Sequence, residues 1–150
     1  MSRRLSRLPS NKQWEIDMVR LALVMHAPLG NAFAQCAAHI LGHEPDILVF
    51  DVQADDPPDE ASRRLERLLE PHQQQGALIL CDIYGATPFN IASRSVRSLT
   101  DRGMDVALVT GANLCMVLKA LTDNQDNPEA LSEKVRQGAL KGVVRADCFS

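Results

Sequence analysis

The chain has 150 residues, of which 45% are hydrophobic and 23% are charged. This composition is typical of one soluble globular domain, and it excludes a disordered chain or a collagen-like repeat. The net charge of −3 is uneven, because residues 1–20 hold five basic and two acidic groups while the other 130 residues hold 11 basic and 17 acidic groups. A domain this acidic binds polyanions poorly, which excludes nucleic acid as a partner.

The organisation along the chain predicts one domain between two tails. Residues 1–17 form a polar extension that we predict to be disordered, residues 18–146 form the domain, and residues 147–150 form a short tail. The longest apolar runs, Leu21–Met25 and Ala77–Cys81, are far too short to cross a bilayer. We therefore expect no membrane insertion.

From residue 18 onward, the hydrophobic pattern alternates between strand and helix. In chain order it predicts a strand at Val19–Met25, a helix at Pro28–Gly42, a strand at Asp46–Val52, a helix at Asp59–Glu70, a strand at Ala77–Asp82, a helix at Pro88–Asp101, a strand at Met104–Thr110, a helix marked by Leu114, Val117, Leu118 and Leu121, a helix from Asn127 and Pro128 to Gly142, and a short edge strand at Val143–Arg145. This alternation favours a parallel sheet. We predict an α/β fold, a mostly parallel, doubly wound sheet of four strands plus the short C-terminal edge strand, with helices on both faces.

Two side-chain patterns carry further expectations. The inward face of the first helix is predicted to consist of Leu29, Phe33, Cys36, Ala37, Ile40 and Leu41. The four cysteines (Cys36, Cys81, Cys115 and Cys148) show no C-x-x-C spacing, which favours buried, inert thiols in a reducing cytoplasm. No zinc spacing emerges from the histidines, so no metal site is expected.

The residues that follow the strands are the candidates for chemistry, because ligands of open α/β sheets bind beyond the carboxyl ends of the strands. His26 follows the first strand, and Asp82 ends the third. Beyond Asp82 come Gly85, Ala86 and Thr87, where Thr87 is predicted as the N-cap of a helix with proline at its first position. The small residues and the free N–H groups of such a helix start suit a phosphate.

Each of these features has an ordinary explanation when taken alone. His26 is equally well a structural histidine, Asp82 a loop-capping carboxylate, and Thr87 part of a normal helix start. If the first and third strands are neighbours, however, the three converge. They then supply a nucleophilic imidazole, a carboxylate that holds its tautomer and a site for an anion, which are the parts needed for a phosphohistidine.

Four segments carry a resemblance to a known family. They are Leu21–His26 (LALVMH), Leu80–Ser93 (LCDIYGATPFNIAS), Val109–Leu118 (VTGANLCMVL) and the helix start Asp126-Asn127-Pro128. With these segments the chain resembles, over residues 18–146, the IIA component of the mannose class of the bacterial phosphoenolpyruvate-dependent sugar phosphotransferase system. The most specific part is the D-x-x-G-[GA]-[ST]-P-F-N segment.

The resemblance implies the roles of the site residues. His26 matches the phosphorylated histidine, Asp82 the carboxylate that hydrogen-bonds its ring, and Thr87 the hydroxyl residue near the phosphoryl group. It implies a cytoplasmic homodimer that exchanges a C-terminal strand, accepts a phosphoryl group from the phosphocarrier HPr and passes it to a IIB component. No cofactor is expected, because the donor is already a phosphohistidine.

The chain departs from the family pattern beside the histidine and in the loop. Met25-His26-Ala27 stands where the family usually has Thr-His-Gly, and Gly85-Ala86 replaces a glycine pair. Losing the threonine removes a hydroxyl, and losing a glycine narrows the freedom of the backbone.

Other functions remain open at this point. One is a regulatory target read through its phosphorylation state, in an incomplete phosphotransferase chain. Another is the phosphoryl-donor component of a dihydroxyacetone kinase. A domain that binds a small molecule without covalent chemistry has less support, because no G-x-G-x-x-G follows any strand.

Overall fold

The computed structural model describes residues 18–124 and 127–148, and the predicted disordered extension, residues 1–17, lies outside them, as does Asp126. The elements are β1 (Arg20–His26), α2 (Leu29–Leu41), β2 (Ile47–Val52), α3 (Pro58–Leu69), the short 3₁₀ helix η1 (Glu70–His72), β3 (Ala77–Cys81), α4 (Thr87–Asp101), β4 (Val106–Val109), α5 (Leu114–Thr122) and α6 (Pro128–Gly142). The predicted helices and the four long strands are confirmed, with bounds that differ by no more than two residues.

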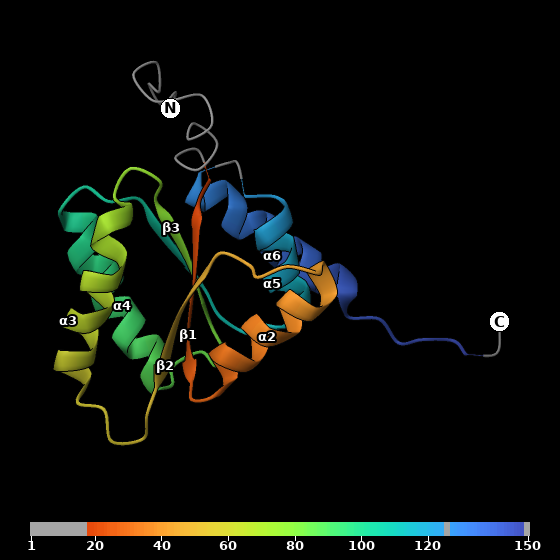
Figure 1. Ribbon diagram of the computed structural model, residues 1–150, viewed down its shortest axis with the longest axis horizontal. Coiled ribbons are helices and arrows are strands. Elements are labelled where there is room, and N and C mark those ends of the chain that lie inside the picture. The colour runs from red at the N-terminus through yellow and green to blue at the C-terminus, as the bar shows by residue number, and fades with distance from the viewer. Residues whose placement is uncertain (1–17, 125–126, 149–150) are drawn as a thin grey trace, which may run out of the picture.

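The four strands form one parallel sheet in the order β2-β1-β3-β4 (Figure 1). Val24 of β1 pairs with Phe50 of β2 on one side and with Cys81 of β3 on the other. The chain therefore moves outward from β1 in one direction to β2 and in the other to β3. The order of the strands reverses between β1 and β3, which is where such sheets bind ligands.

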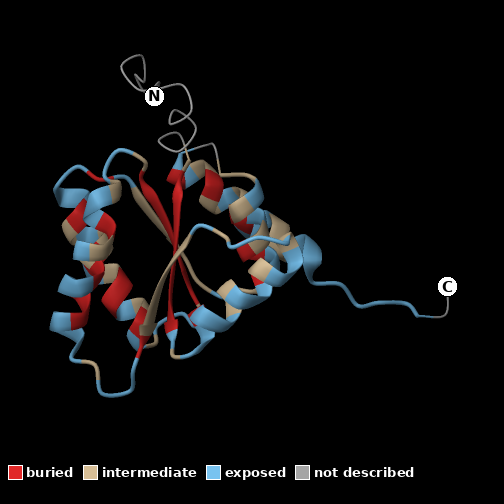
Figure 2. Cartoon of the chain, viewed as in Figure 1, coloured by how far each residue is buried: buried red, intermediate tan, exposed pale blue. Residues whose placement is uncertain are grey.

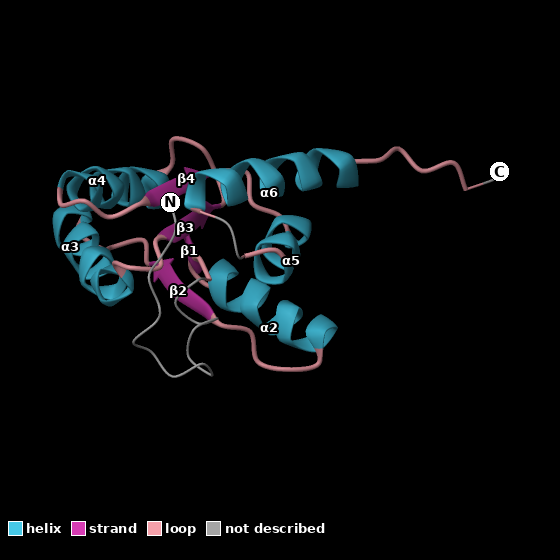
Figure 3. Ribbon diagram, turned by 90° about the horizontal axis from the view of Figure 1, so that it is seen from above, coloured by secondary structure: helices cyan, strands magenta, loops and turns pink. Residues whose placement is uncertain are grey.

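Two hydrophobic cores cover the two faces of the sheet, with α3 and α4 on one face and α2, α5 and α6 on the other (Figure 3). Successive strand side chains point to opposite faces, so Ala22 and Val24 lie in the first core while Leu23 and Met25 lie in the second. The central strands are buried except for His26 at the end of β1, and the helices expose their outer faces (Figure 2). This burial on both faces explains why β1 and β3 read as continuous apolar runs.

The inward face of α2 differs from the prediction. Gly30 and Ala37 are the buried residues of this helix, whereas Leu29 and Ile40 are exposed. A Cβ on Gly30 would come within 2.4 Å of the Asp51 carboxylate, so α2 lies very close to the sheet at its start. Ala37 is buried as predicted, and Phe33 packs partly buried against the same core. The prediction fails at Leu29, Cys36 and Ile40, and it omitted Gly30, whose lack of a side chain allows the closest contact.

Two further predictions are wrong. Val143–Arg145 forms no strand, and Val143 and Val144 are exposed in a segment that runs away from the body (Figure 1). A strand needs a neighbouring edge to pair with, and this segment does not meet one within the described chain. Of the cysteines, Cys36, Cys115 and Cys148 are exposed and Cys81 alone is buried.

The pKa of the Cys81 thiol is raised to about 12, mainly by burial and secondly by the negative charge of Asp82. This thiol is therefore inert, as expected. None of the helices in residues 18–124 and 127–148 is long and apolar enough to cross a bilayer.

Candidate active site

His26 and Asp82 meet at the carboxyl end of the sheet. His26 is the last residue of β1, and Asp82 directly follows β3, its hydrogen-bonded neighbour. The His26 Nδ1 atom lies 2.7 Å from Asp82 Oδ2, so Nδ1 is the ring atom that faces the carboxylate. The same Oδ2 accepts the backbone N–H of His26 at 3.1 Å. Side chain and main chain of the histidine are therefore held by one oxygen.

The Asp82 carboxylate is almost fully buried and well supplied with donors. Its side chain is 7% exposed, and its second oxygen accepts the N–H of Ile83 at 3.0 Å. Burial alone would raise the pKa of Asp82, but the hydrogen bonds from His26 and the attraction of its ring outweigh burial, so the pKa lies below 3.8. Asp82 is therefore ionised near neutral pH and acts as an acceptor.

The other ring nitrogen of His26 faces outward. The side chain is 48% exposed, and Nδ1 is the ring atom through which it bonds within the described chain. A carboxylate that accepts the Nδ1 proton leaves the lone pair on Nε2. The arrangement can therefore present Nε2 as a nucleophile to a reagent that arrives from outside.

The start of α4 differs from the prediction in one respect. Ala86, with extended backbone, is the N-cap residue, while Thr87 and Pro88 are the first two helical residues. Thr87 is thus not the N-cap, and no side-chain cap bond closes this helix. Because Pro88 is the second helical residue and not the first, Thr87 is the first helical residue instead of the N-cap.

Several donors at this helix start are free. Within residues 18–124 and 127–148, the N–H groups of Gly85, Thr87 and Phe89 have no hydrogen-bond partner, whereas the N–H of Ala86 reaches Ile83 O at 3.4 Å. Gly85 has a φ of +80°, a conformation that favours glycine. Unpaired N–H groups and the helix dipole make such a place favourable for an anion.

The three departures from the family pattern, at Met25, Ala27 and Ala86, can be located in the structure. Met25 is fully buried in the core under α2, α5 and α6, on the opposite face from Val24. The Ala27 N–H is already bonded to Val52 O at 3.0 Å. Ala86 has a φ of −80°, so glycine is not required there.

One polar residue of this edge was missed by sequence reasoning. Asp51, in β2, accepts the N–H of Gly30 at 2.8 Å and those of the Asn31 main chain and side chain at 3.1 Å. Asp51 therefore satisfies the first backbone N–H groups of α2. A carboxylate near the end of an apolar strand is the same signal that singled out Asp82, and it was available in the sequence.

The loop that follows β2 is bonded within itself, because the Gln53 N–H is donated to Asp56 Oδ2 at 2.8 Å. Within the described part of the chain, no group of three or more histidine, cysteine, aspartate or glutamate side chains could hold a metal ion.

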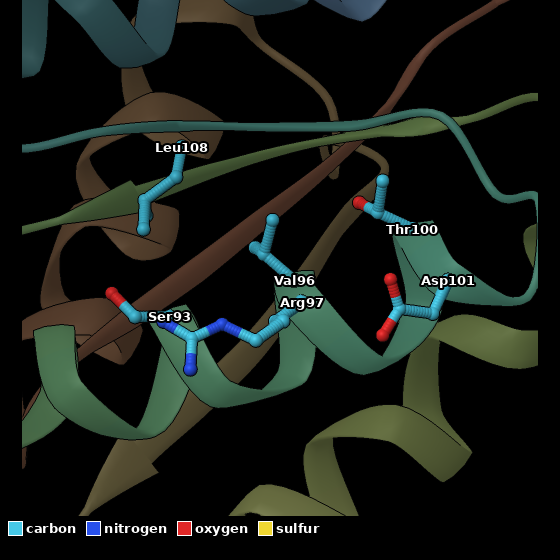
Figure 4. Close-up of a pocket in the computed structure, with 6 residues that line it drawn as sticks. All are labelled: Ser93, Val96, Arg97, Thr100, Asp101 and Leu108. Atoms are coloured by element: carbon cyan, nitrogen blue, oxygen red, sulfur yellow. The ribbon is translucent and has the colours of Figure 1, made fainter.

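A groove of about 350 Å³ lies elsewhere, between α4 and β4. It is lined by Ser93, Val96, Arg97, Thr100, Asp101 and Leu108 (Figure 4). Leu108 belongs to β4 and the other five belong to α4, so the groove follows the outer edge of the sheet. Neither His26 nor Asp82 lines it.

Comparison with known families shows the family to which this chain belongs. The family model described as "PTS system fructose IIA component" matches residues 20–136, a range that contains His26, Asp82 and the start of α4. The chain belongs to the EIIA-man family. Its members are components of the phosphotransferase system, which confirms the resemblance to mannose-class IIA components.

Solved structures share the fold. The mannose/sorbose specific IIA subunit from Enterococcus faecalis superposes with a TM-score of 0.79 at 22% identity, covering 89% of this chain and 98% of that one. The phosphotransferase component EIIA from Streptococcus agalactiae gives 0.76 at 22% identity, with 85% and 97% covered. A sigma-54 interaction domain protein from Enterococcus faecalis gives 0.70 at 16% identity, with 89% and 98% covered. At these identities the likeness concerns the fold, an α/β domain with a four-stranded parallel sheet.

Proposed function

We propose that this EIIA-man protein accepts a phosphoryl group from phospho-HPr on His26 and passes it to a IIB component. The observation that carries the proposal is the 2.7 Å contact between His26 Nδ1 and Asp82 Oδ2, because it frees Nε2 for attack. The half-exposed ring and the free N–H groups at the start of α4 support it. Family membership makes this site the expected one for phosphotransfer.

The transfer exchanges one P–N bond for another. The Nε2 lone pair of His26 attacks phosphorus in line with the carrier histidine, and the P–Nε2 bond forms as the P–N bond to the carrier breaks. The electron pair of the broken bond returns to the carrier imidazole. Asp82 keeps the Nδ1 proton in its hydrogen bond and stabilises the positive charge that develops on the His26 ring. The reverse sequence hands the group to the IIB component.

The negative charge on the phosphoryl oxygens is stabilised by hydrogen-bond donors at the start of α4. The N–H groups of Gly85 and Thr87, and the Thr87 hydroxyl, are the donors that we assign to it. Pre-positioned donors of this kind act most strongly on the charge of the transition state. The proposal needs no metal or organic cofactor, because the P–N bond of the phosphorylated carrier already supplies the free energy for the transfer.

The direct test is phosphorylation of the His26→Ala variant. We expect no mass increase on that variant after incubation with phosphoenolpyruvate, enzyme I and HPr, while the wild type gains one phosphoryl group. The exposed His39 on α2 supplies the matched control, and His39→Ala should be phosphorylated like the wild type. Label on the His26→Ala protein would refute the assignment.

A time course separates relay from regulation. Loss of the label only when a IIB protein is added supports transfer, whereas slow loss at one rate with and without IIB supports a protein that is read through its phosphorylation state. Rapid loss on adding the nucleotide-bound subunit of a dihydroxyacetone kinase would identify that enzyme as the acceptor.

The proposal includes a cytoplasmic homodimer, as the family resemblance implies. The edge of β4 opposite β3 is unpaired within the described chain, and the groove beside it is open (Figure 4). Val143 and Val144, exposed beyond α6, are apolar and free to pair with such an edge in a second copy. A chain that ends after Gly142 should then be a monomer by light scattering, and an unchanged dimer would refute this strand exchange.

A further inference from the structure

Two successive carbonyl groups at the start of α4 are bound by one residue, Asn90. The backbone N–H of Asn90 is donated to Ala86 O at 3.0 Å, which is the first hydrogen bond of the helix. The side-chain Nδ2 of Asn90 is donated to Gly85 O at 3.5 Å. Asn90 therefore fastens the last two residues of the loop to the first turn of the helix.

The direction of these carbonyls fixes the direction of the N–H groups beside them. The peptide between Gly85 and Ala86 is trans, and in a trans peptide the C=O and the N–H point in opposite directions. Because both carbonyls point toward Asn90, the N–H groups of Ala86 and Thr87 point away from the helix, as an anion at its start requires. A Gly85 carbonyl that turned around would present the negative end of its dipole to the phosphoryl oxygens.

A second restraint on the same peptide comes from Ala86. Turning this peptide over would change the φ of Ala86 from −80° to a positive value. Alanine avoids positive φ because of its Cβ, whereas glycine adopts it readily. The Ala86 N–H adds only a long contact of 3.4 Å with Ile83 O. The Asn90 amide and the Cβ of Ala86 are therefore the two main restraints that hold the Gly85 carbonyl in place.

We propose that Asn90 is a positioning residue for phosphotransfer, which keeps the Gly85 carbonyl turned away from the phosphoryl group and the neighbouring N–H groups turned toward it. This inference rests on the proposed function and adds a residue that acts through the loop without touching the phosphoryl group. Asn90 is exposed, so its amide fills no space in the core. Its effect is on the rate of transfer after the donor is bound, because prepositioned donors act on the charge of the transition state.

The first test removes the amide donor and keeps the shape of the side chain. In Asn90→Leu, the kcat for phosphorylation by phospho-HPr should fall about three- to tenfold while the KM changes by less than about twofold. Phosphoramidate, a small phosphoryl donor, should show the same fall in rate, because the defect lies in the loop of this protein. Asn90→Gln keeps an amide donor and should remain faster than Asn90→Leu. Gln137→Leu, the same kind of change at an exposed amide on α6, is the control and should stay within about twofold of wild type.

The second test measures the coupling between Asn90 and Ala86. Ala86→Gly alone should slow the transfer about two- to threefold, because Asn90 still holds the peptide. In Asn90→Leu/Ala86→Gly both restraints are lost, so the rate should lie at least about threefold below the product of the two single effects. Two independent losses of helix stability would instead multiply.

The outcomes are distinguishable. An unchanged kcat in Asn90→Leu, equal rates in Asn90→Leu and Asn90→Gln, or single effects that simply multiply in the double variant overturns the positioning role. A defect confined to the KM for phospho-HPr and absent with phosphoramidate also overturns it, since Asn90 would then contact the carrier. In each case the labelling of wild-type His26 leaves the proposed function standing. Wild type that is labelled by neither donor refutes the proposed function itself.

Discussion

The starts of α2 and α4 lie at the same end of the sheet, but their backbone N–H groups have different partners. Each helix follows a central strand, and each has an aspartate nearby, Asp51 for α2 and Asp82 for α4. Asp51 accepts the N–H groups of Gly30 and of the next residue, so the positive end of α2 already holds a carboxylate. Asp82 accepts from His26 instead, and the start of α4 keeps free N–H groups.

The spacing between aspartate and helix accounts for this difference. Gly30 brings α2 so close to β2 that no side chain other than hydrogen would fit beside the Asp51 carboxylate. At α4, the loop from Ile83 to Ala86 separates Asp82 from the first helical residue. One carboxylate therefore stabilises a helix, while the other orients an imidazole and leaves a helix start open for an external anion.

The largest expected difference is between removing these two carboxylates. Asp82→Asn should slow phosphorylation of His26 by about 100-fold or more, because the amide no longer selects the Nδ1–H tautomer. Asp51→Ala should leave that rate nearly unchanged and lower the free energy of unfolding by about 1 kcal/mol, the usual effect of losing a helix cap. Quench-flow labelling with phospho-HPr and urea denaturation of both variants measure the two quantities.

Equal loss of rate in both variants would break the distinction between a catalytic and a structural carboxylate. A wild-type rate in Asp82→Asn would show that the contact with His26 has no orienting role.

The conformation of the loop before α4 offers a second pair of variants. Gly85 and Gly42 both have positive φ, and a Cβ would meet nothing within 4 Å at either position. Alanine should therefore cost about 1 kcal/mol of stability at both, through backbone strain alone. Only Gly85→Ala should also lower the phosphorylation rate, by about tenfold, because it shifts the N–H groups that face the phosphoryl group. Similar rates in the two variants would mean that this loop does not contact the phosphoryl group.

The Thr87 hydroxyl should have a smaller effect. Because Thr87 is the first helical residue and not the cap, Thr87→Val should leave stability within about 0.5 kcal/mol of wild type. Loss of the hydrogen bond that this hydroxyl donates to the phosphoryl group should slow transfer by about three- to tenfold. Thr100→Val, near the other end of α4, is the control, and equal rates in the two variants would remove Thr87 from the site.

The sequence was sufficient for the parts of this comparison that depend on strand order and on residue type. Apolar runs in β1 and β3 predicted buried parallel strands, and the polar residues at their ends, His26 and Asp82, predicted the meeting point. The hydrophobic pattern, together with glycines and prolines, predicted the helix and strand bounds to within two residues of those observed.

The failures depend on geometry that residue type does not encode. The cap at α4 shifted by one residue because proline is accepted at either of the first two helical positions. The role of Asp51 depends on how closely Gly30 approaches β2, which no local pattern shows. The strand expected at Val143–Arg145 depends on an edge that this chain does not offer to its own C-terminus.

The smallest expected effect is the pH dependence of stability that comes from Asp82. Its pKa is lower in the folded protein than the ordinary value of 3.8, since its hydrogen bonds with His26 outweigh the effect of burial. A carboxylate whose pKa falls on folding stabilises the protein fully above the unfolded pKa, and the contribution disappears as the pH drops through the folded pKa. The difference in unfolding free energy between wild type and Asp82→Asn should therefore shrink as the pH falls below about pH 4. Urea denaturation across this range measures it, with Asp51→Asn as the comparison. A difference that stays constant down to about pH 3 would mean that the charge of Asp82 is not what the contact with His26 stabilises.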